Sequence, residues 1–245
     1  MKGLAWDDPL RIRSLQELED WVEEVGFLPL FADEVEGFSA EEHVSPDYWW
    51  TGVQSEDPWE WRELIAARRR VAYGKFFGGR AGFISQAWLP CFANARRDGY
   101  DFDARWEDGL ASAREKRVMD LLTDRDGDGD VLWKTEEILS TELKKQAGFG
   151  KGGAKNFPGI ITGLQMQTYL VIAGFRRRLN KKGEAYGMAV SVLLPPEAIW
   201  GYGTVTSAYH ESPGDSWQRI YERVRELYPA AGKEEIHKVI GRRPK

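Results

Sequence analysis

Hydrophobic positions near the N-terminus recur at the spacing of an amphipathic helix. In LQELEDWVEEV, residues 15–25, apolar side chains return every three or four positions. Ser14 is a suitable N-cap, Glu17 stands where a capping box requires an acid, and Gly26 can end the helix. We therefore expect a helix over residues 15–25.

Less regular sequence follows, and then a second helix and a hairpin. Residues 27–52 contain prolines and scattered aromatic side chains without a clear period. Pro58 suits the first turn of a helix over 57–70. Residues 71–85, VAYGKFFGGRAGFIS, place GG between two aromatic runs, which predicts a tight hairpin. A helix or an extended bridge is expected over 86–106.

The second half of the chain has the element order of a winged helix. Helices are expected within residues 109–123, 140–149 and 156–170. The β-rich run 169–193 then predicts a hairpin with NKKGE, residues 180–184, at its tip. Two amphipathic helices, 213–229 and 233–241, complete the pattern.

These elements predict an α+β fold of tandem winged-helix modules, with helices and short β-hairpin wings. We expect an N-terminal winged-helix-like part over 1–108, rich in acid and tryptophan. A basic winged-helix domain over 109–205 follows, and then C-terminal helices with a basic tail over 206–245.

Composition narrows the class of protein. The chain of 245 residues is 42% hydrophobic and 30% charged, which is ordinary for a globular protein. Apolar runs are too short for a membrane span, so we expect no membrane association and a cytoplasmic location. Cys91 is the single cysteine, which excludes disulfides within the chain and multi-thiolate zinc sites. We expect no cofactor and no resident metal.

Charge is strongly segregated along the chain although the net charge is only -5. Residues 14–61 contain fourteen acids and no Lys or Arg, whereas residues 144–186 contain nine cations and one acid, Glu184. The basic segment suits a polyanion, and the acidic segment suits a protein partner. A second interpretation remains open, in which two solvated surfaces complement each other.

The glycine-rich stretch GFGKGGAKNF, residues 148–157, resembles a phosphate-binding loop. A nucleotide P-loop requires a preceding strand and a Lys followed by Ser or Thr, and Lys151 is instead preceded by a helix and followed by Gly152. Two interpretations remain: Lys151 and Lys155 lie beside a nucleic-acid backbone, or the stretch is a plain turn between packed helices.

The basic hairpin RRRLNKKGEAYG is the second candidate for contact with nucleic acid. Its cations are Arg176, Arg177, Arg178, Lys181 and Lys182. At the tip of a wing they would contact phosphates or a minor groove. The alternative is that these cations lie on an exposed hairpin and only keep the protein soluble.

Two acidic stretches are candidates for calcium binding and for acid–base catalysis. Asp124, Asp126, Asp128 and Asp130 have the spacing of a calcium loop, but Thr135 stands where a bidentate Glu is required, so a solvated acidic turn remains the alternative. The Asp-rich run 98–108 could supply an acid–base pair or simply turns and caps.

Histidine and tryptophan carry weaker signals. The three histidines are scattered and predict no nucleophilic triad. Trp49, Trp50, Trp59 and Trp61, with Arg62, could stack on an extruded base or could belong to the core.

Two longer segments resemble the AlkZ-type DNA glycosylases, a family built of tandem winged helices. Residues 68–97 resemble the family's aromatic hairpin and Arg-rich helix, and residues 142–178 resemble its winged-helix segment. The resemblance covers most of residues 14–205 and is closest to the branch named as AlkZ-related. It implies duplex DNA as the partner and DNA repair as the setting.

The catalytic pair of that family has no counterpart at the corresponding place. Active members carry Gln-x-Asp or Gln-x-Gln in an N-terminal stretch, where GFLPLF has Pro29 and Phe31. Gln165 and Gln167 in LQMQ lie in the later winged helix, where they could face a base edge or pack within the helix. The sequence therefore predicts a duplex DNA-binding protein. The alternatives are a DNA glycosylase with non-standard catalytic residues and a protein-interaction module.

Overall fold

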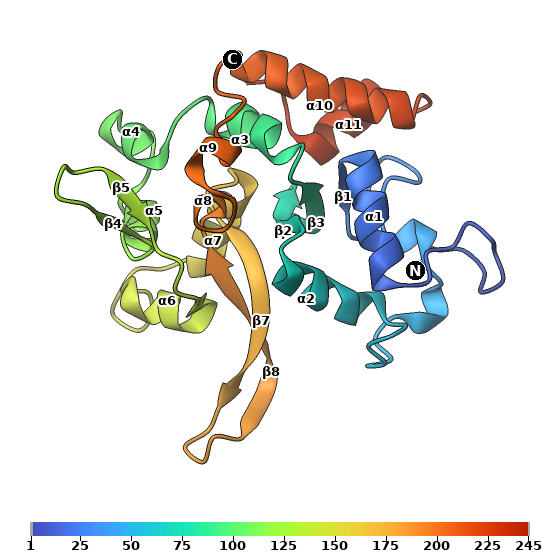
Figure 1. Cartoon of the computed structure of the whole chain (residues 1–245), viewed down its shortest axis with the longest axis horizontal. Coiled ribbons are helices and arrows are strands. Elements are labelled where there is room, and N and C mark those ends of the chain that lie inside the picture. Colours follow the sequence, from blue (N-terminus) through green and yellow to red (C-terminus); the bar gives the residue numbers. More distant parts are fainter. Residues whose placement is uncertain (1, 245) are drawn as a thin grey trace.

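A computed structural model describes residues 2–244 as a mixed α+β fold (Figure 1). The helices are α1 (Leu15–Val25), α2 (Pro58–Arg68), α3 (Leu89–Arg97), α4 (Phe102–Glu107), α5 (Ala113–Met119), α6 (Ser140–Gln146), α7 (Phe157–Met166), α8 (Pro196–Trp200), α9 (Tyr202–Val205), α10 (Pro213–Leu227) and α11 (Lys233–Ile240), with 3-10 turns η1 (Glu41–His43) and η2 (Pro46–Tyr48). The expected α+β class is confirmed.

Three small antiparallel sheets complete the fold. The strands are β1 (Phe27–Pro29), β2 (Val71–Phe77), β3 (Arg80–Ser85), β4 (Thr123–Arg125), β5 (Val131–Trp133), β6 (Ile138–Leu139), β7 (Val171–Leu179) and β8 (Ala185–Leu194). They pair in the orders β1-β3-β2, β4-β5 and β6-β8-β7. In Figure 1 the β7–β8 hairpin extends far from the body of the molecule.

Local sequence accounts for the best-defined element boundaries. The Ser14 hydroxyl accepts a hydrogen bond from the Glu17 backbone N–H at 3.2 Å, and Gly26 ends α1 with φ of 100°. Gly78 and Gly79 turn between β2 and β3 with φ of 58° and 82°, a region that strongly favours glycine. These predictions are confirmed.

The helix expected over 109–123 is shorter than its apolar pattern suggests. It begins only after Ser112, whose hydroxyl and backbone N–H form a capping box with Glu115. It ends at Met119, because the chain then turns into the β4–β5 hairpin.

The apolar residues form two main cores. The larger one combines α1, α2, the β1–β3 sheet and α3 with side chains from the C-terminal helices, among them Trp217, Ile220 and Ile236. The second joins α5, α6 and α7 to β8, with Leu143 and Leu164 fully buried. The C-terminal helices α10 and α11 thus pack on the N-terminal part, although they are separated from it in sequence.

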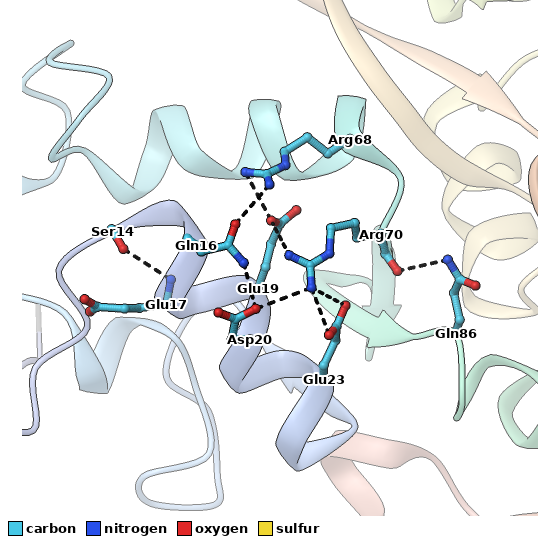
Figure 2. A network of polar contacts seen from close by, with 9 residues as sticks. All are labelled: Ser14, Gln16, Glu17, Glu19, Asp20, Glu23, Arg68, Arg70 and Gln86. Atoms are coloured by element: carbon cyan, nitrogen blue, oxygen red, sulfur yellow. Dashed lines mark hydrogen bonds and ion pairs between the residues drawn. The ribbon is translucent and has the colours of Figure 1, made fainter.

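An ion-pair network attaches the acidic α1 to the end of α2 (Figure 2). The buried Glu19 carboxylate lies 3.3 Å from Arg68 and 3.5 Å from Arg70, and Glu23 lies 2.9 Å from Arg70. Burial raises the pKa of Glu19, while Arg68 and Arg70 oppose that rise. Part of the acidic segment is therefore neutralised by arginines that follow it within the N-terminal half.

A second ion pair is buried between α3 and α8. Arg97 donates to Glu197 at 2.5 Å, and each side chain is 1% exposed. Arg97 also donates to the Thr168 carbonyl at 2.7 Å and lies 4.5 Å from the centre of the Tyr169 ring. This cluster fixes the start of β7 against α3.

Between residues 2 and 244, the helices are all too short or too polar to cross a membrane.

Candidate nucleic-acid interface

A groove of about 870 Å³ lies where α2 and the β2–β3 hairpin meet the β7–β8 hairpin. Aromatic side chains from each of these parts and from the preceding loop line it: Phe31, Trp59, Tyr73 and Phe175. Cations also line it: Arg62, Lys75, Arg80 and Arg177. The groove therefore combines flat apolar surfaces with positive charge, and Glu60 and Glu63 are its acids.

Arg62 is held between two rings from distant parts of the sequence. Its guanidinium carbon lies 3.6 Å from the centre of the Trp59 ring and 4.5 Å from that of Phe175. Its side chain is 7% exposed, and it donates to Glu63 at 3.0 Å. The Arg62 Nε atom is buried without a hydrogen-bond partner within the described chain. The guanidinium of Arg62 therefore lies within the wall of the groove, between the rings of Trp59 and Phe175.

Glu63 is the carboxylate best placed for chemistry in the groove. Burial raises the pKa of Glu63, the Arg62 and Arg177 guanidinium groups lower it, and Glu60 raises it further. The net shift is upward, so this acid holds its proton at higher pH than a solvated glutamate does. Burial also raises the pKa of the facing Tyr73 hydroxyl to about 12, which keeps it neutral. Titratable groups with shifted pKa values in a groove are typical of functional sites.

The predicted cations of the basic hairpin lie on β7 and its tip. All five are exposed: Arg176, Arg177, Arg178, Lys181 and Lys182. Arg176 pairs with Glu137, which also binds Arg69, and the guanidinium of Arg178 lies 5.2 Å from the Tyr186 ring centre. The tip itself is shaped by Asn180, whose carboxamide oxygen accepts from the Lys182 and Glu184 N–H groups. The hairpin thus presents its positive charge to solvent.

The glycine stretch forms the loop between α6 and α7, as the sequence predicts. Lys151 and Lys155 are exposed on it. Phe149 and Phe157 pack beneath the loop with ring centres 5.2 Å apart, so the two ends of the loop are fixed to the second core.

Gln165 lies in α7 and Gln167 directly follows its end. Gln165 is 2% exposed; its side chain accepts from the Lys75 N–H at 3.0 Å and donates to the Ile161 carbonyl at 3.2 Å. Gln167 donates to the Gly163 carbonyl at 3.2 Å. The expectation that Gln165 faces a base edge is not supported, because its amide is buried between α7 and β2. The periodicity of α7 could not reveal that a distant strand covers this face.

Replacing Gln165 with alanine is expected to lower the free energy of unfolding by about 1–3 kcal/mol, because the Lys75 N–H loses its partner. Urea denaturation followed by circular dichroism measures the change. Gln167→Ala is the matched control, since the Gln167 amide bonds only within its own helix. Equal effects of the two replacements would contradict the assigned role of Gln165.

The acidic stretch 124–130 forms a β-hairpin. Asp126 closes its turn by accepting from the Asp128 and Asp130 N–H groups, each at 2.9 Å. Asp124 lies on β4 and pairs with Lys134. The strands β4 and β5 flank the turn, whereas a calcium loop of the type considered requires two helices. Across residues 2–244, three or more potential metal-ligating side chains do not converge at any point.

Fold and groove together define an α+β protein with a cationic, aromatic-lined groove beside an extended basic hairpin. Comparison with known proteins adds a family: residues 12–241 match the family model described as AlkZ related. The match spans nearly the whole chain, so the protein belongs to the AlkZ-related family, which confirms the resemblance seen in its motifs. Curated proteins and solved structures give no match. Membership relates the chain to DNA repair glycosylases.

Proposed function

We propose that this protein binds double-stranded DNA through a winged-helix module. Its parts are α5, β6, α6, α7 and the β7–β8 hairpin, and the sheet order β6-β8-β7 is that of a winged helix. The observation that carries the proposal is the hairpin, which extends from the body with exposed cations along its distal half. Such a wing contacts phosphates and positions the protein on a duplex.

Packing within the protein leaves only part of α7 exposed for the proposed contact with DNA. Thr162 and Met166 face the β2–β3 turn at Gly79, and Gln165 is buried. The N-terminal turn of α7, with the exposed Pro158 and Gly159, remains available next to the loop that carries Lys151 and Lys155. We therefore place the duplex along this loop and the hairpin.

Fluorescence anisotropy of a labelled duplex at about 50 mM salt tests the proposal, because phosphate contacts are strong under this condition. Saturable binding is expected. A lack of measurable affinity would contradict it.

A second candidate, a DNA glycosylase, is favoured by the position of Glu63. In such a reaction a water oxygen bonds to C1′ of the sugar, and the C1′–N bond breaks with its electron pair leaving on the base. The Glu63 carboxylate would accept the proton of that water. The residue lies in the groove with Trp59 and Arg62 on the same helix.

Glu63→Gln is expected to slow base release from an alkylated duplex by about 100-fold or more while duplex binding persists. Because the pKa of Glu63 is raised, the wild-type rate should fall as pH decreases through this raised value, where the carboxylate takes up a proton. A glutamine carboxamide oxygen can still accept the hydrogen bond that the buried Arg62 donates to Glu63, so we expect the variant to remain folded. Formation of abasic sites is the readout, and its absence across several alkylated bases would contradict this candidate.

The acidic segment remains a candidate surface for a protein partner. Glu19, Asp20 and Glu23 are engaged with Arg70 within the chain. Charge reversal at the exposed acids elsewhere in residues 14–61 would weaken such a partnership.

A further inference from the structure

A row of aromatic rings leads from solvent into the groove. The ring centres of Trp50 and Trp59 lie 6.3 Å apart, and those of Trp59 and Phe31 also lie 6.3 Å apart. Trp50 is 59% exposed, whereas its neighbour Trp49 is 6% exposed and packs on Phe31. We call Trp50, Trp59 and Phe31 the aromatic track.

The exposed end of the track is held in a fixed position by a buried carboxylate. Asp57 is fully buried and accepts from the N–H groups of Trp50 at 3.1 Å, Gly52 at 3.0 Å and Trp59 at 2.8 Å. Trp50 adopts φ of 61°, which is rare for a bulky residue. The fold thus maintains an exposed tryptophan in an unfavourable backbone conformation, and such sites are often functional.

The inner end of the track is polar and cationic. Trp59 lies against Arg62, whose other side faces Phe175. Arg177 and Lys75 line the same groove, so positive charge flanks the rings. Flat rings followed by cations suit a ligand made of planar groups on an anionic backbone.

We propose that the aromatic track and the groove bind unpaired DNA bases next to a duplex. The proposal rests on the proposed DNA binding and adds the structural class of DNA that the protein prefers. Every base can stack on an aromatic ring, so the track binds without reading sequence, while the exposed Arg177 and Lys75 bind phosphates. A paired duplex cannot present base faces to Trp50, so it gains nothing from the track.

Two labelled DNAs test the proposal: a fully paired duplex and the same duplex with unpaired thymines at its centre. The wild-type protein is expected to bind the bulged duplex at least about 5-fold more tightly, which is the smallest usual effect of stacking one base. Trp50→Ala should remove this preference and leave affinity for the paired duplex unchanged. Trp106→Ala is the matched control, because Trp106 is 37% exposed on α4 and lies outside the track.

The outcomes separate the two proposals. Binding to both DNAs with equal affinity would overturn the aromatic track and leave the proposed DNA binding intact. A full preference for the bulged duplex in Trp50→Ala would overturn the track as well. No binding to either DNA would contradict the proposed function itself. Because Trp50 is exposed, we expect thermal unfolding of Trp50→Ala to match that of the wild type.

Discussion

Replacing Glu197 with alanine is expected to lower the free energy of unfolding by about 3–5 kcal/mol, the usual cost of leaving one charge of a buried pair without its partner. The Arg97 guanidinium would remain between α3 and α8 with the Thr168 carbonyl and Tyr209 hydroxyl as its polar partners. Burial lowers the pKa of Arg97, whereas Glu197, Tyr209 and Tyr169 raise it, and the net shift is upward. Without Glu197 the charged guanidinium loses its carboxylate partner. Since small domains are stabilised by about 5–15 kcal/mol, this loss is severe.

Equilibrium denaturation in urea measures this change. Glu226→Ala provides the control, because Glu226 forms an ion pair with Arg223 at 2.8 Å but is 67% exposed. Exposed pairs contribute about 0–1 kcal/mol. If the two variants had the same stability, the buried pair would not be a principal link between α3 and α8.

Replacing Arg178, Lys181 and Lys182 together with glutamine should weaken duplex DNA binding by about 100-fold or more at roughly 0.1 M salt. Each cation that contacts a phosphate releases counterions, and the three side chains are exposed at the distal part of the hairpin. Their removal should leave stability nearly unchanged, because all three side chains are exposed.

The matched control removes the same charge elsewhere. Arg225, Lys233 and Lys238 are exposed on α10 and α11, which pack at the side of the molecule opposite the tip of the hairpin (Figure 1). If affinity for the duplex depended on net charge alone, the two triple variants would lose the same amount of affinity. We instead expect the α10–α11 variant to retain nearly all of its affinity, and equal losses would show that the hairpin has no special role.

Short-range signals in the sequence predict many of the helix boundaries and hairpin turns of the fold. Ser14 and Gly26 delimit α1, Gly78–Gly79 turns the β2–β3 hairpin, and residues 180–184 form the tip of the basic hairpin. Each of these depends on the conformational preference of a few neighbouring residues, which the chain displays directly.

Pairing over long distances in sequence could not be predicted in the same way. The strand β1 has three residues and pairs with β3, more than fifty positions later. Asn94 binds the Ala208 and Glu211 carbonyls and the Ser216 hydroxyl, which joins α3 to the C-terminal helices. These contacts depend on complementary surfaces that periodicity does not encode.

The candidate site was foreseen in part. The sequence predicts the exposed cations of the hairpin and the tryptophans near Arg62 as candidates for contact with nucleic acid. It does not predict the groove, because the contact of Arg62 with Phe175 joins elements more than a hundred residues apart. The sequence does not predict a site at Glu63, because an acid in the middle of a charged helix is usually solvated. Its position four residues after Trp59 on α2 is the available signal, since residues three or four positions apart share a helix face.

The dependence of duplex binding on salt measures directly how many cations of the protein contact phosphates. Titrations of the wild type between about 50 and 200 mM salt should give a slope of log affinity against log salt of about -4 or steeper, as expected when five or more cations contact phosphates. The Arg178, Lys181 and Lys182 variant should have a slope shallower by about 2.7, which corresponds to three lost contacts. Identical slopes for the two proteins, or no binding at the lowest salt, would contradict duplex binding through the basic hairpin.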